Sequence, residues 1–283
     1  MMKKANRVFW IGLIVLVVGG GVAMGQWFRR GYIDEDNPRA VFERRGIEFP
    51  DWEASPEMPT DVFTFARLRY RDGGYRRRGG SWDTDYPDSD LNFSYRLQEL
   101  TSLEVDPDGK IVDIDAEELA EYPWVYMIEP GDIHLNDEEA QILRHYMMNG
   151  GFIMVDDFWG DYEYDRFYQA LKKIFPEREP RELPIEHPIF HFVFDLKEKP
   201  QVPAINAAMS GYTYEFREGD SGRDVSYQGV FDDKNRMMMI ICHNTDLGDG
   251  WEREGENEYY FKTFSEPLSF PMGINIVFYA LTH

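Results

Sequence analysis

The 283-residue sequence predicts an α/β domain in which helices cover a mostly parallel central sheet. Continuous apolar runs at 123–128 and 152–156 are typical of buried parallel strands. Amphipathic segments alternate with these runs at the spacing of right-handed βαβ units. A helix-ending motif, Asn149-Gly150-Gly151, separates one such helix from the next strand. About 230 residues follow Pro50, which is enough for one sizeable domain.

Each element is predicted from its own local pattern. Alternating or continuous apolar residues predict strands over 61–70, 111–114, 123–128 and 152–156. Capping residues and helical periodicity predict helices over 91–103, with Asp88-Ser89-Asp90 as N-cap, 136–148 and 164–175. The last part of the chain follows a different pattern, which predicts a β-hairpin over 227–242 and a closing helix from Ser269 to about 281.

The N-terminal residues carry an export pattern. Basic residues among the first seven precede an apolar segment over 8–24, and 23–25 has the form of a signal-peptidase site. Residues 1–25 are therefore predicted to be a signal peptide or an uncleaved membrane anchor, a transmembrane helix. Either alternative places the main domain outside the cytoplasm, in the periplasm or at the membrane. Residues 26–60 are predicted to be a linker that partly packs on the domain formed by 61–283.

The charge balance excludes some classes of partner. Residues 1–31 contain five basic and no acidic residues, so the remainder carries 25 basic against 52 acidic residues, a net charge of −27. Such a surface repels nucleic acid and anionic lipid headgroups, and a nucleic-acid partner is not expected. The single cysteine, Cys242, excludes an intrachain disulfide and is expected to be a small buried hydrophobe.

Spaced motifs over roughly residues 60–283 resemble an uncharacterised bacterial family. The motifs include Trp82-Asp83, Tyr122-Pro123, Gly150-Gly151-Phe152, Asp156-Asp157, His187-Pro188-Ile189-Phe190, Gly222-Arg223 and Asp249-Gly250-Trp251-Glu252. The family is labelled only as a domain of unknown function, DUF4159. It is in turn similar to the class I glutamine-amidotransferase-like superfamily, which includes trehalose-utilisation-type proteins. The resemblance implies a flavodoxin-like, three-layer α/β/α sandwich.

The same resemblance bears on the active site. In amidotransferases of that fold, the strand after the Gly-Gly helix end leads to a catalytic cysteine. Here that place holds Asp156, Asp157 and Phe158, so the resemblance implies a domain without the thiol nucleophile. Cys242 does not replace it, because Cys242 and His243 are neighbours on a strand and point to opposite faces.

Asp156 and Asp157 are the first candidate catalytic residues. They end a predicted buried strand, and in open α/β sheets ligands collect beyond the carboxyl ends of strands. The two acids could supply a general base, a pair of metal ligands or a helix cap. His187, which precedes a proline, and His243, at the end of the hairpin strand, could join them as acid–base or metal partners. The alternative for each histidine is an ordinary hydrogen-bonded loop residue.

Arginines form the basic group of candidate binding residues. Arg67 and Arg69 share one strand face and could clamp a carboxylate or phosphate, whereas Arg76–Arg78 lie in a glycine-flanked loop. The alternative is that these arginines neutralise the domain's own acids, such as Asp83 and Asp85.

Tryptophans and a further acid complete the candidate binding site. Three indole rings are predicted either to stack on sugars or to cover the core: Trp82, Trp159 and Trp251. Asp246 follows His243 and is expected at the same sheet edge. The segments 83–85 and 246–249 lack the twelve-residue calcium-loop pattern, so any calcium site there would be irregular.

Together these features predict an exported or membrane-anchored domain of the cell envelope. Its expected role is to bind a carbohydrate or another small polar or anionic ligand, or to act within a protein assembly. The alternative is a hydrolase that uses Asp156 or Asp157 with His187, with or without a metal ion. No cofactor is predicted, and the identity of any metal is left open. The predicted partners are the ligand, cell-envelope proteins and, through an uncleaved leader, the membrane.

Overall fold

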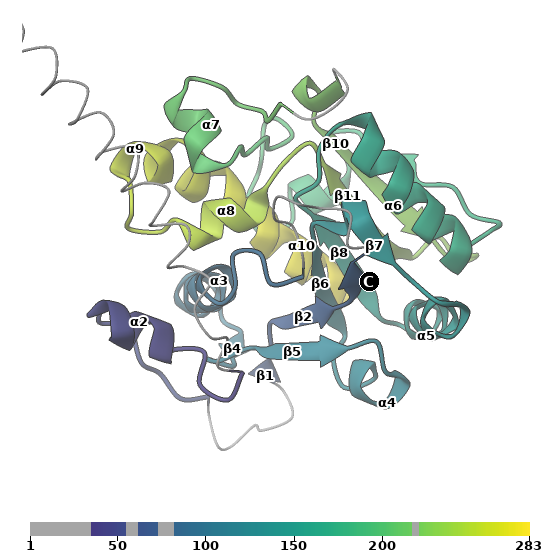
Figure 1. Cartoon of the computed structure of the whole chain (residues 1–283), viewed down its shortest axis with the longest axis horizontal. Helices are drawn as coiled ribbons and strands as arrows, with labels where there is room; N and C mark the ends of the chain where they lie inside the picture. The colour runs from purple at the N-terminus through teal and green to yellow at the C-terminus, as the bar shows by residue number, and fades with distance from the viewer. Residues whose placement is uncertain (1–34, 55–61, 73–81, 217–220) are drawn as a thin grey trace, which may run out of the picture.

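A computed structural model describes residues 35–54, 62–72, 82–216 and 221–283. Within these residues a central sheet lies between helices, which confirms the predicted mixed α/β architecture with a mostly parallel sheet (Figure 1). The strand order across the sheet is β5-β2-β6-β8-β11-β10-β9. The first five strands in this order run parallel, whereas β10 is antiparallel to them, and β9 at the edge pairs antiparallel with β10 and so runs in the same direction as the first five.

The strands of this sheet are short. The strands that pair in parallel are β2 (Ala66–Arg69), β5 (Lys110–Asp113), β6 (Trp124–Ile128), β8 (Phe152–Asp156) and β11 (Met237–His243). The remaining two strands, β10 (Ser226–Phe231) and β9 (Arg181–Glu182), make antiparallel pairs. Two smaller pairings join β1 (Val62–Phe63) to β4 (Glu104–Val105) and β3 (Arg71–Asp72) to β7 (Ile133–His134). The strand predicted over 61–70 is therefore interrupted, since β1 and β2 belong to different sheets.

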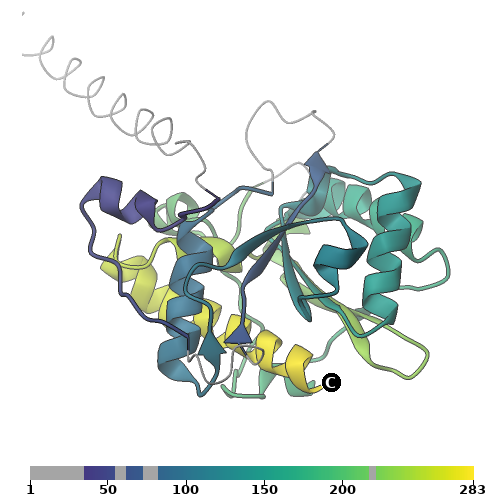
Figure 2. The same cartoon turned by 90° about the horizontal axis from the view of Figure 1, so that it is seen from below.

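Helices cover both faces of the sheet (Figures 1 and 2). One face carries α3 (Asp88–Leu100), α8 (Leu247–Glu252) and α10 (Phe270–Thr282), and the other carries α4 (Ala116–Leu119), α5 (Asp137–Met148) and α6 (Gly160–Ile174). Shorter elements are α2 (Ala40–Arg45), α7 (Ile205–Met209), α9 (Glu258–Tyr260), the 3-10 turns η1 (Pro130–Asp132), η2 (Pro188–Phe190) and η3 (Ser221–Arg223), and the π-helical η4 (Phe261–Ser269).

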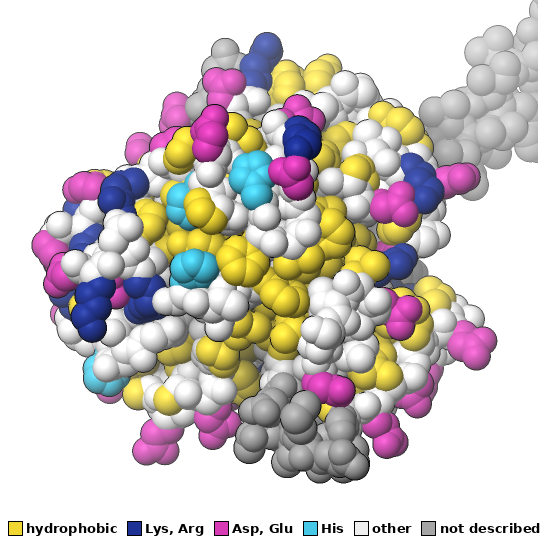
Figure 3. Space-filling model, turned by 180° about the vertical axis from the view of Figure 1, so that it is seen from behind, with side chains coloured by type: hydrophobic (Ala, Val, Ile, Leu, Met, Phe, Trp, Pro, Cys, Tyr) yellow, Lys and Arg dark blue, Asp and Glu magenta, His cyan; other side chains and the backbone are white. Residues whose placement is uncertain are grey.

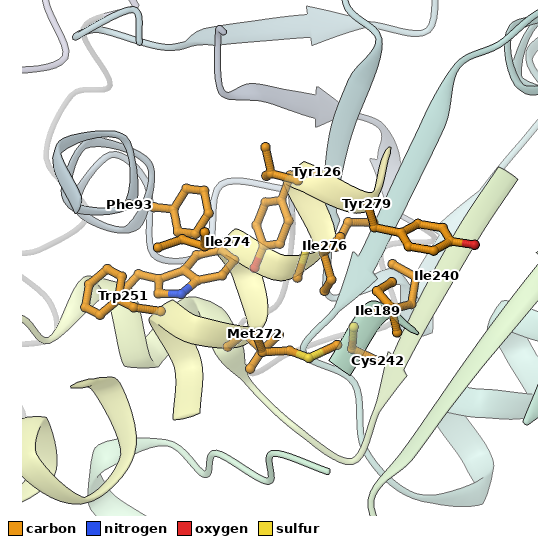
Figure 4. Packing of buried hydrophobic residues seen from close by; sticks show 14 of the residues in the cluster. Phe93, Tyr126, Ile189, Ile240, Cys242, Trp251, Met272, Ile274, Ile276 and Tyr279 are labelled. Carbon is orange, nitrogen blue, oxygen red and sulfur yellow. The ribbon is translucent and has the colours of Figure 1, made fainter. Parts of the chain in front are cut away.

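The alternation of side chains along the strands divides the core into two clusters. Tyr126 and Met154 face α3, α8 and α10, whereas Val125 and Val155 face α5 and α6. Both faces of these strands are buried, which is why their sequences are continuously apolar. In the first cluster, Trp251 and Phe93 lie at one end and Tyr279 and Ile189 at the other (Figure 4).

Local chemistry explains where the helices begin. The Asn136 side chain accepts the Glu139 N–H, and the Glu139 carboxylate accepts the Asn136 N–H, so the predicted start of α5 is confirmed by a capping box. α3 begins earlier than predicted: Asp88-Ser89-Asp90 form its first turn, where acids favour the helix dipole, rather than its cap. α6 likewise begins at Gly160, before the predicted Tyr164.

Two predictions for the last part of the chain need correction. β10 and β11 form the predicted hairpin, but β11 also pairs parallel with β8 and so belongs to the central sheet. The closing helix does not start at Ser269, because α9 and η4 run into α10 without a break. Pro267 lies inside the π-helical segment, and Pro271 lies just after the junction between η4 and α10.

The described part of the predicted linker contacts the domain. Trp52 donates a hydrogen bond to the Val105 carbonyl, and Arg45 forms an ion pair with Asp88. The predicted leader over 1–25 lies outside the described residues. Among the described helices, none is long and apolar enough to span a bilayer.

On the face shown in Figure 3, acidic side chains are spread around a central group of apolar ones.

Candidate functional site

The carboxyl ends of β8 and β11 meet at one edge of the sheet and bring carboxylates together there. β8 ends at Asp156, which Asp157 follows, and Asp246 follows β11 as the N-cap of α8. Because β8 and β11 pair in parallel, these segments emerge side by side. The sheet edge therefore collects three of the predicted site residues.

Asp156 is completely buried beneath the start of α8. The Tyr126 hydroxyl and the Gly248 N–H each donate a hydrogen bond of 3.0 Å to Asp156 Oδ2. Burial raises the pKa of Asp156 to about 7, although these two hydrogen bonds act in the opposite direction. The carboxyl group therefore ties β6, β8 and α8 together and exchanges its proton near neutral pH.

Two groups of three carboxylates share Asp246. Asp157, Glu215 and Asp246 form the first group, and Asp85, Asp246 and Asp249 form the second. In each group the candidate ligand oxygens lie within 4.8 Å of one another. Oxygen-only sets of this kind suit Ca²⁺ or Mg²⁺. Asp157 and Asp246 are buried, whereas Glu215 and Asp85 are partly exposed, so both groups reach solvent through their outer members.

Asp85 points into the second group. Its Oδ2 atom is inaccessible to solvent and accepts no hydrogen bond from the described residues. A Cβ added to Gly248 would lie 3.0 Å from this oxygen. Burial, followed by the charge of Asp249, raises the pKa of Asp85 to about 8, whereas Arg253 and Arg67 lower it. A carboxylate oxygen that is buried without a donor favours either protonation of Asp85 or a bound cation.

The negative charge of Asp249 is well compensated by hydrogen-bond donors, whereas that of Asp246 is not. Asp249 accepts hydrogen bonds from Arg253 Nε at 3.0 Å, the Ile205 N–H at 2.7 Å and the Tyr260 hydroxyl at 3.1 Å. For Asp246, burial and then the charges of Asp157, Asp85 and Asp249 raise the pKa well above its usual range. Asp246 is therefore the centre of the excess negative charge.

Left-handed backbone conformations gather around the same edge. Asp85, Glu129, Asp157 and Asn244 have φ values of 60°, 47°, 53° and 60°, although none is glycine. Such a conformation costs about 1–3 kcal/mol per residue and is found preferentially at binding and catalytic sites. The local strain thus coincides with the carboxylate groups.

Arg67 has a structural role in place of the predicted anion-binding one. The residue is completely buried, and its Nε donates to Asp90 Oδ2 at 2.9 Å. Its Nη1 donates to the Trp82 and Thr84 carbonyls at 2.9 and 2.8 Å, and its Nη2 donates to Asp90 and to the Ser89 hydroxyl. No donor remains for a ligand, and Arg67 instead holds the loop that carries Asp85.

The structure does not bring His187 to the carboxylates. Its Nδ1 accepts the Ile189 N–H, and its ring packs on Tyr279 near the end of α10. The opposite end of α10 is the one near the site, where the Ser269 hydroxyl bonds to the Leu247 carbonyl. About ten residues of helix, or roughly 15 Å, separate the two places.

His243 reaches the correct edge but faces the wrong way. It follows Cys242, which lies on the Asp156 side of the sheet, so alternation turns the imidazole to the opposite face. There its Nε2 lies 3.1 Å from the Gly160 carbonyl oxygen, and burial lowers the pKa of His243 to about 4. His243 is therefore a neutral packing residue at physiological pH.

The tryptophans mostly cover the core. Trp251 is completely buried against Phe93, and the equally buried Trp159 donates from Nε1 to Asp157 Oδ1 at 3.1 Å. Neither ring offers a face to a sugar, which corrects the predicted stacking role. Trp82 is only half-buried and lines a surface cavity of about 460 Å³ together with Arg69.

Arg69 pairs with the domain's own acids. Its guanidinium donates to Asp113 at 2.7 Å and to Glu35 at 2.9 Å, and lies 5.7 Å from the centre of the Trp82 ring. This arrangement matches the neutralising alternative for the arginines. Arg76–Arg78 lie outside the described residues.

Residues 64–281 match the family described as Domain of unknown function (DUF4159). The chain belongs to this family. The DUF4159 region contains every strand of the central sheet and both carboxylate groups. A comparison with curated proteins gives no match. Membership in DUF4159 therefore assigns no activity, and the function has to be argued from the geometry of the site.

Sequence reasoning found only part of this geometry. Asp246 was predicted at the sheet edge, but Glu215 was not considered, because nothing in its aromatic, loop-like surroundings marks it as a ligand. The sequence presents Asp85 only as an acid that the arginines could neutralise or as part of an irregular calcium site. The proximity of Asp85 to Asp246 depends on the loop that Arg67 holds, which local sequence does not reveal.

Proposed function

We propose that this chain is an exported, cation-dependent ligand-binding domain of the cell envelope. The observation that carries the proposal is the pair of carboxylate groups that share Asp246 at the carboxyl edge of the sheet. Asp85 supports it independently, since its buried Oδ2 accepts no hydrogen bond from the described residues and faces the Asp246–Asp249 turn. A hard divalent cation, Ca²⁺ or Mg²⁺, is the kind of ion that carboxylate oxygens grouped in this way would bind.

The arrangement favours binding over the alternative hydrolase. Within the described residues, neither His187 nor His243 joins the carboxylates to form an acid–base pair. A cation held by three carboxylates retains coordination positions for oxygen atoms of a ligand, because Ca²⁺ takes about six to eight oxygens. The ligand class that follows is one with hydroxyl, carboxylate or phosphate oxygens.

The strand order supports a flavodoxin-like placement of the fold. Numbered along the chain, the five parallel strands have the order 2-1-3-4-5 across the sheet, which is the flavodoxin-like order. We place the domain on the class I amidotransferase-like scaffold, with Asp156 and Asp157 where those enzymes carry the cysteine. The basic and apolar N-terminal segment supports an extracytoplasmic location.

Calorimetric titration of the full-length protein with Ca²⁺ and with Mg²⁺, after treatment with a chelator, tests the proposal. Asp246→Asn should weaken cation binding at least about tenfold, which corresponds to about 1.4 kcal/mol. The amide oxygen of Asn can still accept the Asp249 N–H, so the cap of α8 is retained. The cation-free variant should melt at a higher temperature than the wild type, because Asn cannot ionise in a buried position beside other carboxylates.

Asp165→Asn is the matched control, because Asp165 is exposed on α6 and the substitution changes the net charge equally. It should leave cation affinity unchanged. The proposal fails if neither cation binds the wild type, or if Asp246→Asn and Asp165→Asn have the same effect.

A further inference from the structure

A cavity of about 490 Å³ lies at the end of the sheet opposite the carboxylate groups. It opens between α4 and α5, which lie side by side, and the segments that lead into β6 and β8 complete its wall (Figure 1). β6 and β8 are parallel and five residues long, so roughly 16 Å of strand separates this amino edge from Asp156. The volume is within the range of about 300–1,000 Å³ found for small-molecule sites. The cavity is therefore large enough for a ligand and separate from the carboxylate groups.

The wall of the cavity is mostly apolar. On the α4 side it is formed by two small side chains, Ala116 and Ala120, and on the α5 side by Ile142 and the ring of Tyr146. Pro123 lies between the two helices at the start of β6. Apolar walls of this kind bury the hydrocarbon part of a ligand, and the space exists because α4 presents alanines here.

The aromatic part of the wall is fixed by the fold. The Tyr146 hydroxyl donates to the Tyr122 carbonyl at 2.7 Å and to the Phe152 carbonyl at 3.3 Å. A Cβ added to Gly151 would lie 2.3 Å from Tyr146 Cζ, so the ring packs directly on the glycine. The Tyr146 ring is thus held at both its edge and its face, and the cavity is formed before any ligand enters.

Hydrogen-bond acceptors line the cavity beside this apolar wall. The Glu117 carboxylate is exposed and forms no ion pair within the described residues. The Asn149 side-chain amide donates to the His145 carbonyl at 2.7 Å, and the same nitrogen lies 3.2 Å from His145 Nδ1. The Asn149 Oδ1 atom is the part of this amide left to accept a hydrogen bond. Glu117 and Asn149 therefore suit a ligand group that carries N–H donors.

The electrostatic field at the cavity favours a positive charge. The cavity lies at the C-terminal end of α5, where the helix dipole is negative. Burial, followed by the charges of Glu121 and Glu118, raises the pKa of Tyr122, which lines the cavity. The faces of Tyr122 and Tyr146 also attract cations. Helix end, carboxylates and rings thus act in the same direction.

The Arg236 guanidinium contacts the same helix end without cancelling this field. It donates to the carbonyls of Gly150 and Gly151 at 3.4 Å and to the carbonyl of Met147. Its Nε lies 3.3 Å from Asp232 Oδ2, so the carboxylate of the neighbouring turn matches its charge. The Glu117 charge remains for a ligand.

We propose that this cavity binds a small organic amine as its ammonium ion, with an apolar or aromatic body. The ammonium group would donate to the Glu117 carboxylate and to Asn149 Oδ1. The apolar body would pack on Ala120, Ile142 and the Tyr146 ring. The inference goes beyond the proposed cation-dependent function and does not depend on it.

Ligand-detected NMR titration of the full-length protein near neutral pH tests the proposal with three probes of similar shape. They are phenethylamine, the neutral phenethyl alcohol and the anionic hydrocinnamate. An aliphatic amine is protonated under these conditions, since the pKa of the comparable lysine side chain is about 10.4. Phenethylamine should bind at least about tenfold more tightly than phenethyl alcohol, and hydrocinnamate should bind more weakly than either.

Two variants locate the binding. Glu117→Gln should lower the affinity for phenethylamine about tenfold and leave that for phenethyl alcohol unchanged. Glu99→Gln is the matched control, because Glu99 is exposed on α3, on the other face of the sheet, and the charge changes equally. Ala120→Phe should abolish binding of both probes, because the new ring fills the cavity. Ala120 is exposed, so the fold should tolerate the ring, which a thermal melt checks.

The inference is overturned if phenethylamine does not bind, or if the three probes bind equally well. Equal effects of Glu117→Gln and Glu99→Gln would also overturn it, and this comparison remains decisive even if Ala120→Phe does not fold. Wild-type binding by a folded Ala120→Phe protein would place the amine elsewhere and overturn the assignment of this cavity. Phenethylamine binding that persists in Asp246→Asn would support two separate sites.

Discussion

Two groups of buried charges lie on the same side of the sheet, and they are built differently. Around Arg67, one guanidinium meets the Asp90 carboxylate, the Ser89 hydroxyl and two backbone carbonyls, so charge and hydrogen bonds are complete within the fold. Around Asp246, carboxylates face other carboxylates, and the nearby guanidinium of Arg253 is engaged mainly with Asp249. The loop 82–87 and the first turn of α3 connect the two groups, since Arg67 holds this segment and Asp85 lies in it.

The difference separates a structural charge from a functional one. A buried charged side chain that the fold neutralises completely has no charge or hydrogen-bond donor left for a ligand, even where its residue type suggests a binding role. A buried group with excess charge of one sign is stable only with protons or with a partner from outside. The Arg67 group, which consists of Arg67, Asp90 and Ser89, belongs to the first kind. The Asp246 group, which consists of the five carboxylates of the two groups that share Asp246, belongs to the second.

The largest effect that this comparison predicts is on global stability. Arg67→Met should lower the free energy of unfolding by about 3–5 kcal/mol, because it leaves the Asp90 carboxylate buried without its partner. Chemical denaturation followed by tryptophan fluorescence measures the change. Arg69→Met, on the same strand but in half-exposed ion pairs, should cost less than about 1 kcal/mol. Equal losses in the two variants would remove the basis of the comparison.

A smaller loss of stability is expected for Gly248→Ala, which crowds the Asp246 group without changing its charge. In Gly248→Ala the new Cβ would lie 2.7 Å from the Tyr126 hydroxyl oxygen and 3.0 Å from Asp85 Oδ2. Overpacking of this kind costs about 1–3 kcal/mol, and displacement of Asp85 should weaken cation binding as well. Thermal melts with and without Ca²⁺ measure both changes.

Gly255→Ala is not a suitable control for this substitution, because Gly255 has a φ of 78°. Gln141→Gly provides the comparison instead, since Gln141 is exposed on α5, on the face of the sheet opposite the carboxylate groups. It should reduce stability by roughly 1 kcal/mol and leave the response to Ca²⁺ intact. A Gly248→Ala protein with wild-type stability and Ca²⁺ response would contradict the geometry described for Asp85.

The architecture could be predicted from the sequence because it depends on local patterns. Continuous apolar runs identified β6 and β8, and the Asn136 capping box fixed the start of α5. The burial and the partners of individual charged side chains could not be predicted in this way. Arg67 and Arg69 look equivalent in the sequence, yet the first is completely buried and the second is half-exposed. That distinction depends on the loop packed above β2, a long-range contact that residue spacing does not record.

The Asp246 group should also make the stability of the protein depend on pH, and this effect should be smaller than those of Arg67→Met and Gly248→Ala. The raised pKa of Asp85 means that its contribution to stability is present below its unfolded pKa and is lost as the pH rises through about 8. Cation-free protein should therefore lose stability as the pH rises toward about 8, and the loss should level off above that pH. The part between about pH 6.5 and 8 should amount to at most about 1.4 kcal/mol per pH unit for each titrating group. Ca²⁺ should stabilise the protein more strongly over the same range, because it replaces bound protons.

Comparison with Asp85→Asn isolates this contribution. Asp156 titrates near pH 7 in both proteins, and Asp249, Glu129, Arg253 and Arg67 surround position 85 in both. His243, with its pKa lowered to about 4, completes its contribution below about pH 6.5 and does not interfere. Melts at a series of pH values should give a shallower decline for Asp85→Asn. Parallel curves would show that Asp85 is not the titrating group.

The smallest effect is expected for His187, which belongs to neither group of charges. His187→Asn keeps an acceptor for the Ile189 N–H, and the exchange lies at the far end of α10 from Leu247. Stability should change by less than about 0.5 kcal/mol, and Ca²⁺ affinity should be unaffected. Titration calorimetry and a thermal melt on this variant check both values. A clear loss of Ca²⁺ affinity would mean that the imidazole reaches Asp156 or Asp157 in solution, and it would revive the hydrolase alternative.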